Sequence, residues 1–196
     1  MSQLELLAVA LAIVYLLLAI RENRWCWPAA ALSSLAYLQV FYGAGLYMQA
    51  ALQLFYAAMG IYGWWAWRPA AGGRDVLRIH RWPFRWHVVA LTLIGALGLV
   101  TGTLLTRYTA AEVPYVDSLV SLYAVLATWM VTRKLLENWL YWIVIDSVTL
   151  GLALNQGLRL TAGLFALYVI LAVVGGYRWL KNWRQSPAAH DVVKAL

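Results

Sequence analysis

Seven apolar segments, each close to the length that crosses a bilayer, are the feature that most constrains this chain. They cover residues 4–20, 25–42, 46–67, 88–105, 113–132, 139–156 and 159–180. A helix rises about 1.5 Å per residue, so roughly 17–25 apolar residues span the hydrocarbon core. Charged residues make up only 12% of the chain, whereas a soluble domain carries about a quarter. The sequence therefore predicts an all-α membrane protein with seven transmembrane helices.

The basic residues are distributed very unevenly between the two sides that seven spans define. Thirteen of the 15 Lys and Arg residues fall in the first, third and fifth loops and the C-terminal tail, and only Arg107 and Arg159 fall on the other side. Because basic loops stay in the cytoplasm, we expect the N-terminus outside and the C-terminus in the cytoplasm. This asymmetry accounts for the net charge of +7 and removes the main argument for a nucleic-acid partner.

Two halves of the chain share sequence motifs, which predicts an internal repeat. Glu22-Asn23-x-x-x-Trp27 recurs as Glu137-Asn138-x-x-x-Trp142, 115 residues later, and the block Gly45–Trp67 matches Gly157–Trp179 with an offset of 112. We expect a first three-helix repeat at 1–67, a basic cytoplasmic loop plus a linker helix at 68–112, a second repeat at 113–183 and a cytoplasmic tail at 184–196. The odd linker helix makes the repeats parallel, a 3+1+3 arrangement known in transporters that bind substrate between repeats.

Polar and aromatic residues follow one face of several predicted helices. In lipid, such side chains are costly unless they face the interior of the bundle. The spacing predicts four inward-facing stripes that together line a central site: Asn23, Trp27 and Ser34; Gln49, Gln53 and Tyr56; Asp117, Ser121 and Thr128; and Asn138, Trp142 and Asp146, with Trp139 beside them.

Some of these residues have an equally simple structural interpretation. Asn23 and Asn138 lie near helix ends, where they can act as caps. Trp27 can be core packing, and Asp117 can be interfacial. Tryptophans also gather near the cytoplasmic ends of the third and last helices, where we expect them to anchor the chain at the membrane interface: Trp64, Trp65, Trp67, Trp179 and Trp183.

The residue types in the stripes restrict the ligand. Flat heteroaromatic rings stack on Trp and Tyr, and cationic rings gain further from the aromatic faces. Amide side chains bind hydroxyl and carboxamide groups. No basic residue lies well inside a predicted span, so a phosphorylated ligand would leave its charge unpaired. We therefore expect a neutral or cationic heteroaromatic ligand and no cofactor or metal.

Two stretches of the sequence resemble the bacterial nicotinamide riboside transporter family, PnuC. They are 45–56 with Tyr62-Gly63-Trp64-Trp65-Ala66-Trp67, and a region from Asp117-Ser118 through Glu137-Asn138-Trp139-x-x-Trp142 and Asp146 to Gly175-x-Tyr177-x-Trp179. The resemblance implies a SWEET-like fold in the inner (plasma) membrane and uptake of nicotinamide riboside by facilitated diffusion. It also implies a cytoplasmic kinase that traps the substrate. By motif, Gln53, Asn138, Trp139 and Trp142, with Tyr56, are implied substrate contacts.

Three alternatives to this function are open at the level of sequence. Thr128 stands where the family usually has Gln, and relatives with altered cavity residues carry thiamine or riboflavin. Asp146 or Asp117 can serve ion-coupled transport as a proton relay. An intramembrane enzyme is disfavoured, because no catalytic pattern lies within a span and His80, His87 and His190 lie in loops or at a helix edge. The sequence does not specify an oligomeric state, and a homo-oligomer is compatible with it.

Overall fold

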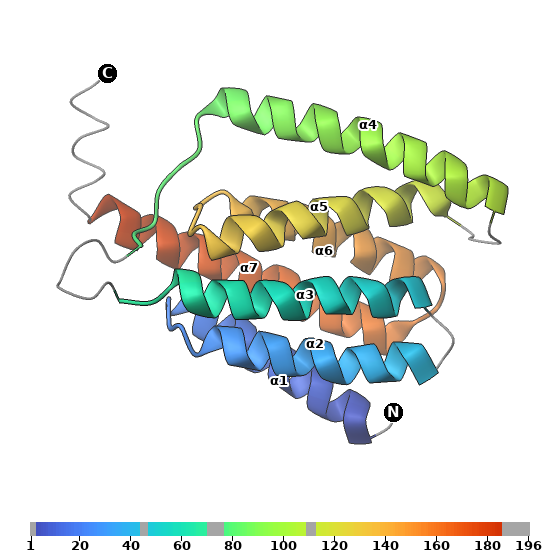
Figure 1. The fold of residues 1–196 in the computed structure, drawn as a ribbon, viewed down its shortest axis with the longest axis horizontal. Coiled ribbons are helices and arrows are strands. Elements are labelled where there is room, and N and C mark those ends of the chain that lie inside the picture. The colour runs from blue at the N-terminus through green and yellow to red at the C-terminus, as the bar shows by residue number, and fades with distance from the viewer. Residues whose placement is uncertain (1–2, 44–46, 70–76, 109–112, 186–196) are drawn as a thin grey trace.

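The computed structural model describes residues 3–43, 47–69, 77–108 and 113–185, and this part of the chain is all helical apart from its connections. Seven α-helices occur in it, one at each predicted segment, and their bounds are α1 Gln3–Ile20, α2 Cys26–Gly43, α3 Tyr47–Ala66, α4 Phe84–Tyr108, α5 Pro114–Thr132, α6 Asn138–Asn155 and α7 Arg159–Arg184 (Figure 1). The predicted bounds hold within two residues except at α4, which extends further at both ends, and at the end of α7. The predicted tail beyond residue 185 lies outside the described residues.

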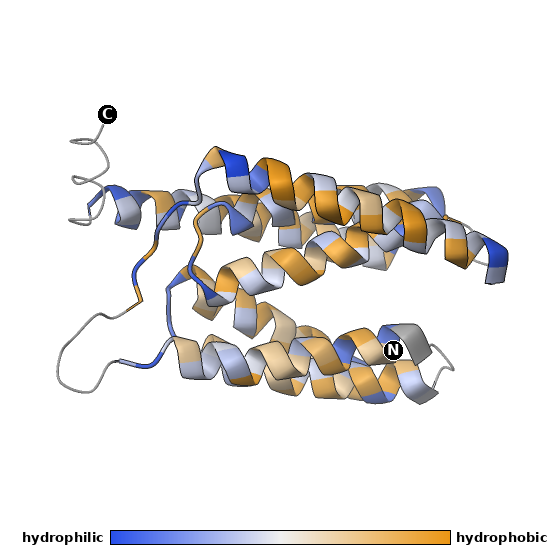
Figure 2. Ribbon diagram, turned by 45° about the horizontal axis from the view of Figure 1, so that its top comes forward, coloured by the Kyte–Doolittle hydropathy of each residue, from blue (hydrophilic) through white to orange (hydrophobic). Residues whose placement is uncertain are grey.

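Four of these helices, α1, α4, α5 and α7, are long and apolar enough to cross a membrane by length and composition. Helices α2, α3 and α6 have similar lengths of 18, 20 and 18 residues but are richer in Trp, Tyr and amide side chains, which lowers their hydropathy. Large apolar side chains point outward, for example Leu93 at 65% and Ile170 at 60% exposure. Hydrophobic residues run along the helices, while strongly hydrophilic ones gather mainly near their ends (Figure 2). Such a surface requires lipid around it.

Six of the helices form a closed ring. Following the contacts around it, the order is α1, α2, α3, α5, α6, α7 and back to α1. Within the described residues, α4 packs mainly against α5, contacts α6 through His87 and Tyr141, and lies outside the ring (Figure 1). The two junctions between the halves are α1 with α7 and α3 with α5. Residues on the inward faces of the six helices therefore share one interior.

Glycines set the close approach of α4 to α5. A Cβ atom placed on Gly102 would lie 2.5 Å from Cδ1 of Tyr115 and 3.0 Å from its Cα, and one on Gly98 would overlap the side chain of Leu119. Gly98 and Gly102 are the buried residues of α4, and they stand one helical turn apart. Small residues at this spacing let two helix backbones approach closely in a membrane.

The packing corrects the predicted register between the halves. Trp27 lies against Gly63, and Trp139 lies against Gly175. The indole rings of Trp27 and Trp67 meet edge to face at 5.3 Å, and those of Trp139 and Trp179 do so at 5.4 Å. These matching contacts are related by a constant offset of 112 residues. The offset of 115 proposed for the first block is wrong in structural terms, because Trp139 and not Trp142 occupies the place equivalent to Trp27.

Candidate functional site

Helix α6 places three of the predicted residues on one inward face. Asn138 opens the helix and is fully buried. Its Nδ2 atom donates to the Leu135 carbonyl at 2.6 Å, whereas its buried Oδ1 atom has no hydrogen-bond partner among the described residues. Trp142 follows one turn later and is half-buried, and Asp146 follows after another turn. A buried acceptor without a donor is costly in a folded protein, so Asn138 Oδ1 is suited to accept a hydrogen bond from a ligand.

Asp146 is the acidic group inside the ring. Its exposure is 6%, and it lies about 12 Å along the helix from Asn138, at 1.5 Å per residue. The carboxylate is an electrostatic neighbour of the phenol groups of Tyr56 on α3 and Tyr168 on α7. The two ion pairs found in the described residues involve Glu22 and Glu137, not Asp146. A carboxylate in this position favours a cationic partner.

The next part of the interior wall is formed by α5 and α3, together with Ile145 of α6. Ala124, Ala127 and Ile145 form a buried cluster against which Tyr56 and Trp142 pack. Thr128 is buried, and its hydroxyl donates to the Ala124 carbonyl of its own helix at 2.8 Å. Gln53 and Ser121 are half-buried. The small alanine side chains leave the aromatic groups of α3 and α6 as the main surfaces of this part of the interior.

Trp27, Trp139 and Asn23 lie toward the ends of the helices, and Gln49, predicted to face the interior, is exposed near the start of α3. Trp27 and Trp139 are 1% and 2% exposed, and the Nε1 atoms of both are buried without a hydrogen-bond partner in the described part of the chain. Asn23 is exposed in the α1–α2 turn, where its Oδ1 atom accepts from the Trp25 backbone N–H at 3.0 Å. The structure therefore packs Tyr56 and Trp142 into one cluster, with Asp146 as an electrostatic neighbour of Tyr56, and it places Asn23 apart from them.

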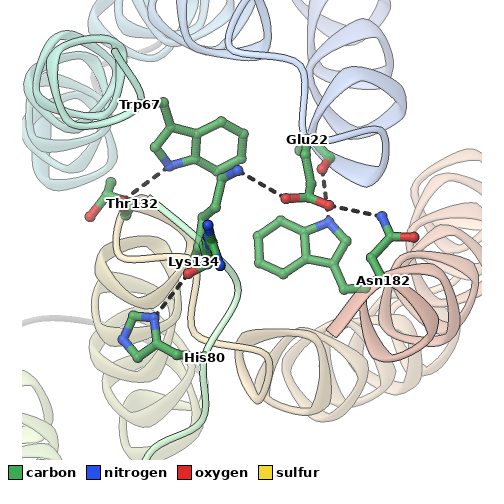
Figure 3. Close-up of polar contacts among 9 residues, drawn as sticks. Glu22, Trp67, His80, Thr132, Lys134 and Asn182 are labelled. Carbon is green, nitrogen blue, oxygen red and sulfur yellow. Dashed lines mark hydrogen bonds and ion pairs between the residues drawn. The ribbon is translucent and has the colours of Figure 1, made fainter. Parts of the chain in front are cut away.

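The end of the ring next to the α1–α2 and α5–α6 turns is closed by contacts between the halves (Figure 3). Lys134 Nζ lies 2.9 Å from Glu22 Oε2, and Asn182 Nδ2 donates to Glu22 Oε1 at 2.8 Å. Trp67 Nε1 donates to the Thr132 carbonyl, and Trp179 Nε1 donates to the Ala19 carbonyl, both at 3.1 Å. We call the Glu22–Lys134 pair with these two indole bonds the end cluster.

Sequence reasoning missed the end cluster. It assigned Trp67 and Trp179 to the membrane interface, but they are 5% and 0% exposed and contact each other at 6.1 Å between ring centroids. The prediction that Trp67 and Trp179 anchor the chain at the membrane interface is therefore wrong. The one available signal was the pattern Gly-x-x-x-Trp, which occurs at Gly63–Trp67 and again at Gly175–Trp179. Tyr168, beside Asp146, was likewise visible only as the repeat partner of Tyr56.

A strap at residues 77–83 holds the α5–α6 turn from outside. Ile79 is buried in the same apolar cluster as Trp67 and Trp179. His80 pairs with the turn through two backbone hydrogen bonds, one from His80 N to the Lys134 carbonyl at 3.2 Å and one from Leu136 N to the His80 carbonyl at 2.9 Å. Arg81 Nε lies 3.0 Å from Glu137 Oε1. The strap is thus hydrogen-bonded to the second half of the chain, while Ile79 also packs against the first half.

A pocket of about 360 Å³ opens at the opposite end of the second half, between the start of α5, the end of α6 and the start of α7. It continues the polar faces of α5 and α6 away from the Asp146 region, and its lining residues are Val113, Asp117, Thr149, Leu152, Ala153, Gln156, Leu158 and Thr161. Asp117, predicted either in the stripe or at the interface, lies here and is exposed. The predicted ligand groups on α6 do not line this pocket.

A ring of helices with apolar outer faces and a polar, aromatic interior defines a multi-pass membrane protein of the kind that moves small solutes. The sequence profile of the nicotinamide mononucleotide transporter family matches residues 2–181. The chain belongs to this family and is a multi-pass membrane transporter of the inner membrane.

Individual relatives agree with this assignment. The riboflavin/roseoflavin transporter RibM of Streptomyces davaonensis is 28% identical over 183 residues, covering 90% of this chain and 84% of the relative. The nicotinamide riboside transporter PnuC of Escherichia coli is 25% identical over 171 residues, covering 74% and 72%. The crystal structure of the vitamin B3 transporter PnuC shares the fold, with a TM-score of 0.75 and 18% identity over 94% of this chain and 83% of that one.

Proposed function

We propose that this chain carries nicotinamide riboside across the membrane by facilitated diffusion, through a site inside the six-helix ring. The observation that carries the proposal is the placement of Asp146. It is buried, it neighbours two phenols, and neither ion pair of the described residues includes it. Nicotinamide riboside bears a cationic pyridinium ring, which a carboxylate and aromatic faces both attract.

The same charge pattern argues against a phosphorylated ligand. Lys134 and Arg81 are engaged with Glu22 and Glu137 near the helix ends, and none of the predicted site residues is basic. A phosphate bound among Tyr56, Trp142 and Asp146 would meet a carboxylate instead of a cation, which is strongly unfavourable in a low-dielectric interior. The proposed cargo is therefore the nucleoside and not the nucleotide.

The proposed mechanism is alternating access by two parallel three-helix units, α1–α3 and α5–α7, with all seven helices crossing the membrane. The offset of 112 residues between matching Trp and Gly contacts supports the repeat. The two junctions also support the repeat. In a repeat, α1 is equivalent to α5 and α3 is equivalent to α7, so the contact of α1 with α7 has its equivalent in the contact of α5 with α3. Such repeats bind substrate near the membrane midplane and rock about it.

Riboflavin is the second candidate cargo. The riboflavin/roseoflavin transporter is somewhat more similar to this chain than the nicotinamide riboside transporter is, at 28% against 25% identity. Thr128, buried on α5 with its hydroxyl bonded to the Ala124 carbonyl, is one of the positions where the chain departs from the nicotinamide riboside family pattern. Riboflavin is neutral, so it would leave Asp146 without a charge partner, and this ranks it below nicotinamide riboside. Thiamine, a cationic vitamin, is a further comparison.

Uptake into liposomes containing the purified protein tests the proposal. Labelled nicotinamide riboside is expected to equilibrate across the liposome membrane faster than riboflavin or thiamine. Its rate should stay the same after the proton gradient and membrane potential are collapsed. A rate that falls on collapse would favour ion coupling through Asp146 or Asp117. Because facilitated diffusion stops at equilibrium, accumulation in the cell needs a trapping reaction, and the proposed partner for it is a cytoplasmic kinase.

The site assignment needs a matched pair of variants. Replacing Gln53, Asn138 and Trp142 together by Ala is expected to abolish uptake, because all three groups face the interior. Replacing Leu140 and Val144 by Ala is the control, since both lie on the outer face of the same helix α6 and are 63% exposed. Full uptake by the triple variant would refute the assignment.

A further inference from the structure

The end cluster joins the two halves at equivalent points of the chain. Glu22 and Lys134 are 112 residues apart, the offset that relates Trp27 to Trp139 and Trp67 to Trp179. Each ends a helix in the same way. Glu22 N donates to the Ala19 carbonyl and Lys134 N to the Val131 carbonyl, both at 3.0 Å, and the next residue of each turn donates back to Leu18 or Met130. An ion pair between two equivalent positions, one in each half, lies at the interface between the halves.

Both turns hold their charged residue in an unusual backbone conformation. Glu22 has φ 54° and Lys134 has φ 52°, and in the described residues they are the two non-glycine residues with positive φ. This region is unfavourable for residues with a side chain, and glycine usually occupies it at helix ends. Both positions instead carry long side chains of opposite charge that face each other. The unfavourable positive φ therefore occurs at the two residues that form the ion pair.

The pair is backed by a wall of indole rings on its inner side. Lys134 Nζ lies 4.7 Å from the centroid of the Trp67 ring, and the bonds from Trp67 to Thr132 and from Trp179 to Ala19 each cross from one half to the other (Figure 3). Beyond the pair, a pocket of about 250 Å³ is lined by Glu22 and Lys134 themselves, with Leu77, Arg78, Ile79, Asn182 and Trp183. The ion pair therefore separates this outer pocket from the buried core.

We propose that the Glu22–Lys134 ion pair is a gate, which seals the interior of the ring at the end carrying the α1–α2 and α5–α6 turns and separates whenever the site opens to that side. This inference rests on the proposed alternating access, and it adds the device that closes one end. Opening breaks one ion pair, the hydrogen bond from Asn182 to Glu22 and the two reciprocal indole bonds, all of which lie between the halves. The Arg81–Glu137 pair stays intact, because it joins the strap to the second half alone.

Chemical labelling of the native Cys26 can report opening of this gate without any substrate. It is the one cysteine of the chain, it is fully buried, and it packs in the same cluster as Trp67, Val131 and Trp179 from both halves. In nanodiscs, a membrane-impermeant maleimide is expected to modify Cys26 about fivefold or more faster in Glu22→Gln and Lys134→Met than in the unchanged protein, because the open state becomes more populated. The charge-exchanged double variant Glu22→Lys with Lys134→Glu is expected to restore slow labelling. Arg81→Gln is the control and is expected to label slowly.

Equal labelling rates in the unchanged protein and in both single variants would overturn the gate, as would a charge-exchanged variant that labels as fast as the singles. A general loosening of the fold would also raise labelling, so a second measurement is needed. In a Cys26→Ala background, Glu22→Cys with Lys134→Cys is joined by a short bis-maleimide, which bridges the space left by the two shortened side chains.

Cross-linking this pair is expected to reduce nicotinamide riboside uptake at least about tenfold, since alternating access requires the turns to part. The matched pair Arg81→Cys with Glu137→Cys, cross-linked in the same way, is expected to keep its uptake. Undiminished uptake through the cross-linked gate pair would refute the proposal. If the uncross-linked variants and the unchanged protein carry none of the tested vitamins while Cys26 labelling still follows the ion pair, the proposed cargo fails and the gate stands.

Discussion

Among single side chains, Asp146 makes the clearest distinction between cargoes. We predict that Asp146→Asn weakens binding of nicotinamide riboside by about tenfold to a hundredfold, because a hydrogen-bonded charge partner contributes roughly 1.5–3 kcal/mol. Binding of neutral riboflavin should change by less than about threefold, since Asn keeps the shape and an acceptor atom. Isothermal titration of the purified protein measures both affinities.

The control for this substitution is Ser147→Ala on the same helix. Ser147 is exposed and turned away from the interior, so both affinities should stay unchanged. An equal loss of affinity for the cationic and the neutral vitamin in Asp146→Asn would show that the carboxylate holds the fold and does not select charge.

Residue spacing predicted the α6 face but not the indole cluster. Asn138, Trp142 and Asp146 stand four residues apart, and because a helix repeats every 3.6 residues, this spacing places them on one side whatever they pack against. A Trp at the end of an apolar helix is different, because the same sequence suits an interface anchor or a buried core residue. Trp67 and Trp179 became core residues through Gly63 and Gly175, which are distant from the partners Trp27 and Trp139 in sequence.

At the scale of helices, the position of α4 depends on two glycines that face α5. We predict that Gly102→Ala lowers the melting temperature, because the new Cβ atom would meet Tyr115 backbone and ring atoms at 2.5–3.0 Å, and overpacking of this kind costs about 1–3 kcal/mol. Nicotinamide riboside affinity should stay unchanged, since α4 lies outside the ring. Thermal unfolding followed by tryptophan fluorescence, with and without the vitamin, measures both.

Gly95→Ala supplies the matched control on the same helix. A Cβ atom there would approach only the hydroxyl of Tyr123, at 3.4 Å, and Ala is the better helix former by about 1 kcal/mol. Its melting temperature should be equal to or higher than that of the unchanged protein. A drop as large as that of Gly102→Ala would mean that α4 packing does not depend on the Gly98–Gly102 face.

The existence of all seven helices and most of their ends followed from apolar length alone, but the two ends of α4 and the end of α7 did not. The sequence placed the start of α4 at residue 88 because Arg85 and His87 are polar, whereas the helix begins at Phe84, directly after Pro83. His87 is accommodated by a 3.0 Å contact between its Nδ1 atom and the Tyr141 hydroxyl. Local hydropathy does not report such long-range contacts, and this is also why the role of the strap was not predicted.

At the scale of the whole molecule, the ring order explains how one interior serves two halves, and the charge asymmetry predicts how that ring lies in the membrane. Helix α7 begins at the end of the bundle opposite to the end where α4 begins (Figure 1). Because 13 of the 15 basic residues belong to the loops and tail that the sequence assigns to this side, this end should face the cytoplasm. Phe84 and Leu160 mark the two ends, and they are almost equally exposed, at 82% and 83%.

Because the two side chains are equally exposed, a difference in cysteine labelling between these positions reports which side of the membrane each one faces. In a Cys26→Ala background, a membrane-impermeant maleimide applied to intact spheroplasts should modify Leu160→Cys and leave Phe84→Cys unmodified until the cells are lysed. The reverse result would invert the predicted orientation. Modification of both from outside would contradict an odd number of spans between the two positions, and with it the seven-span topology on which parallel repeats depend, because α4, α5 and α6 are the helices that separate Phe84 from Leu160.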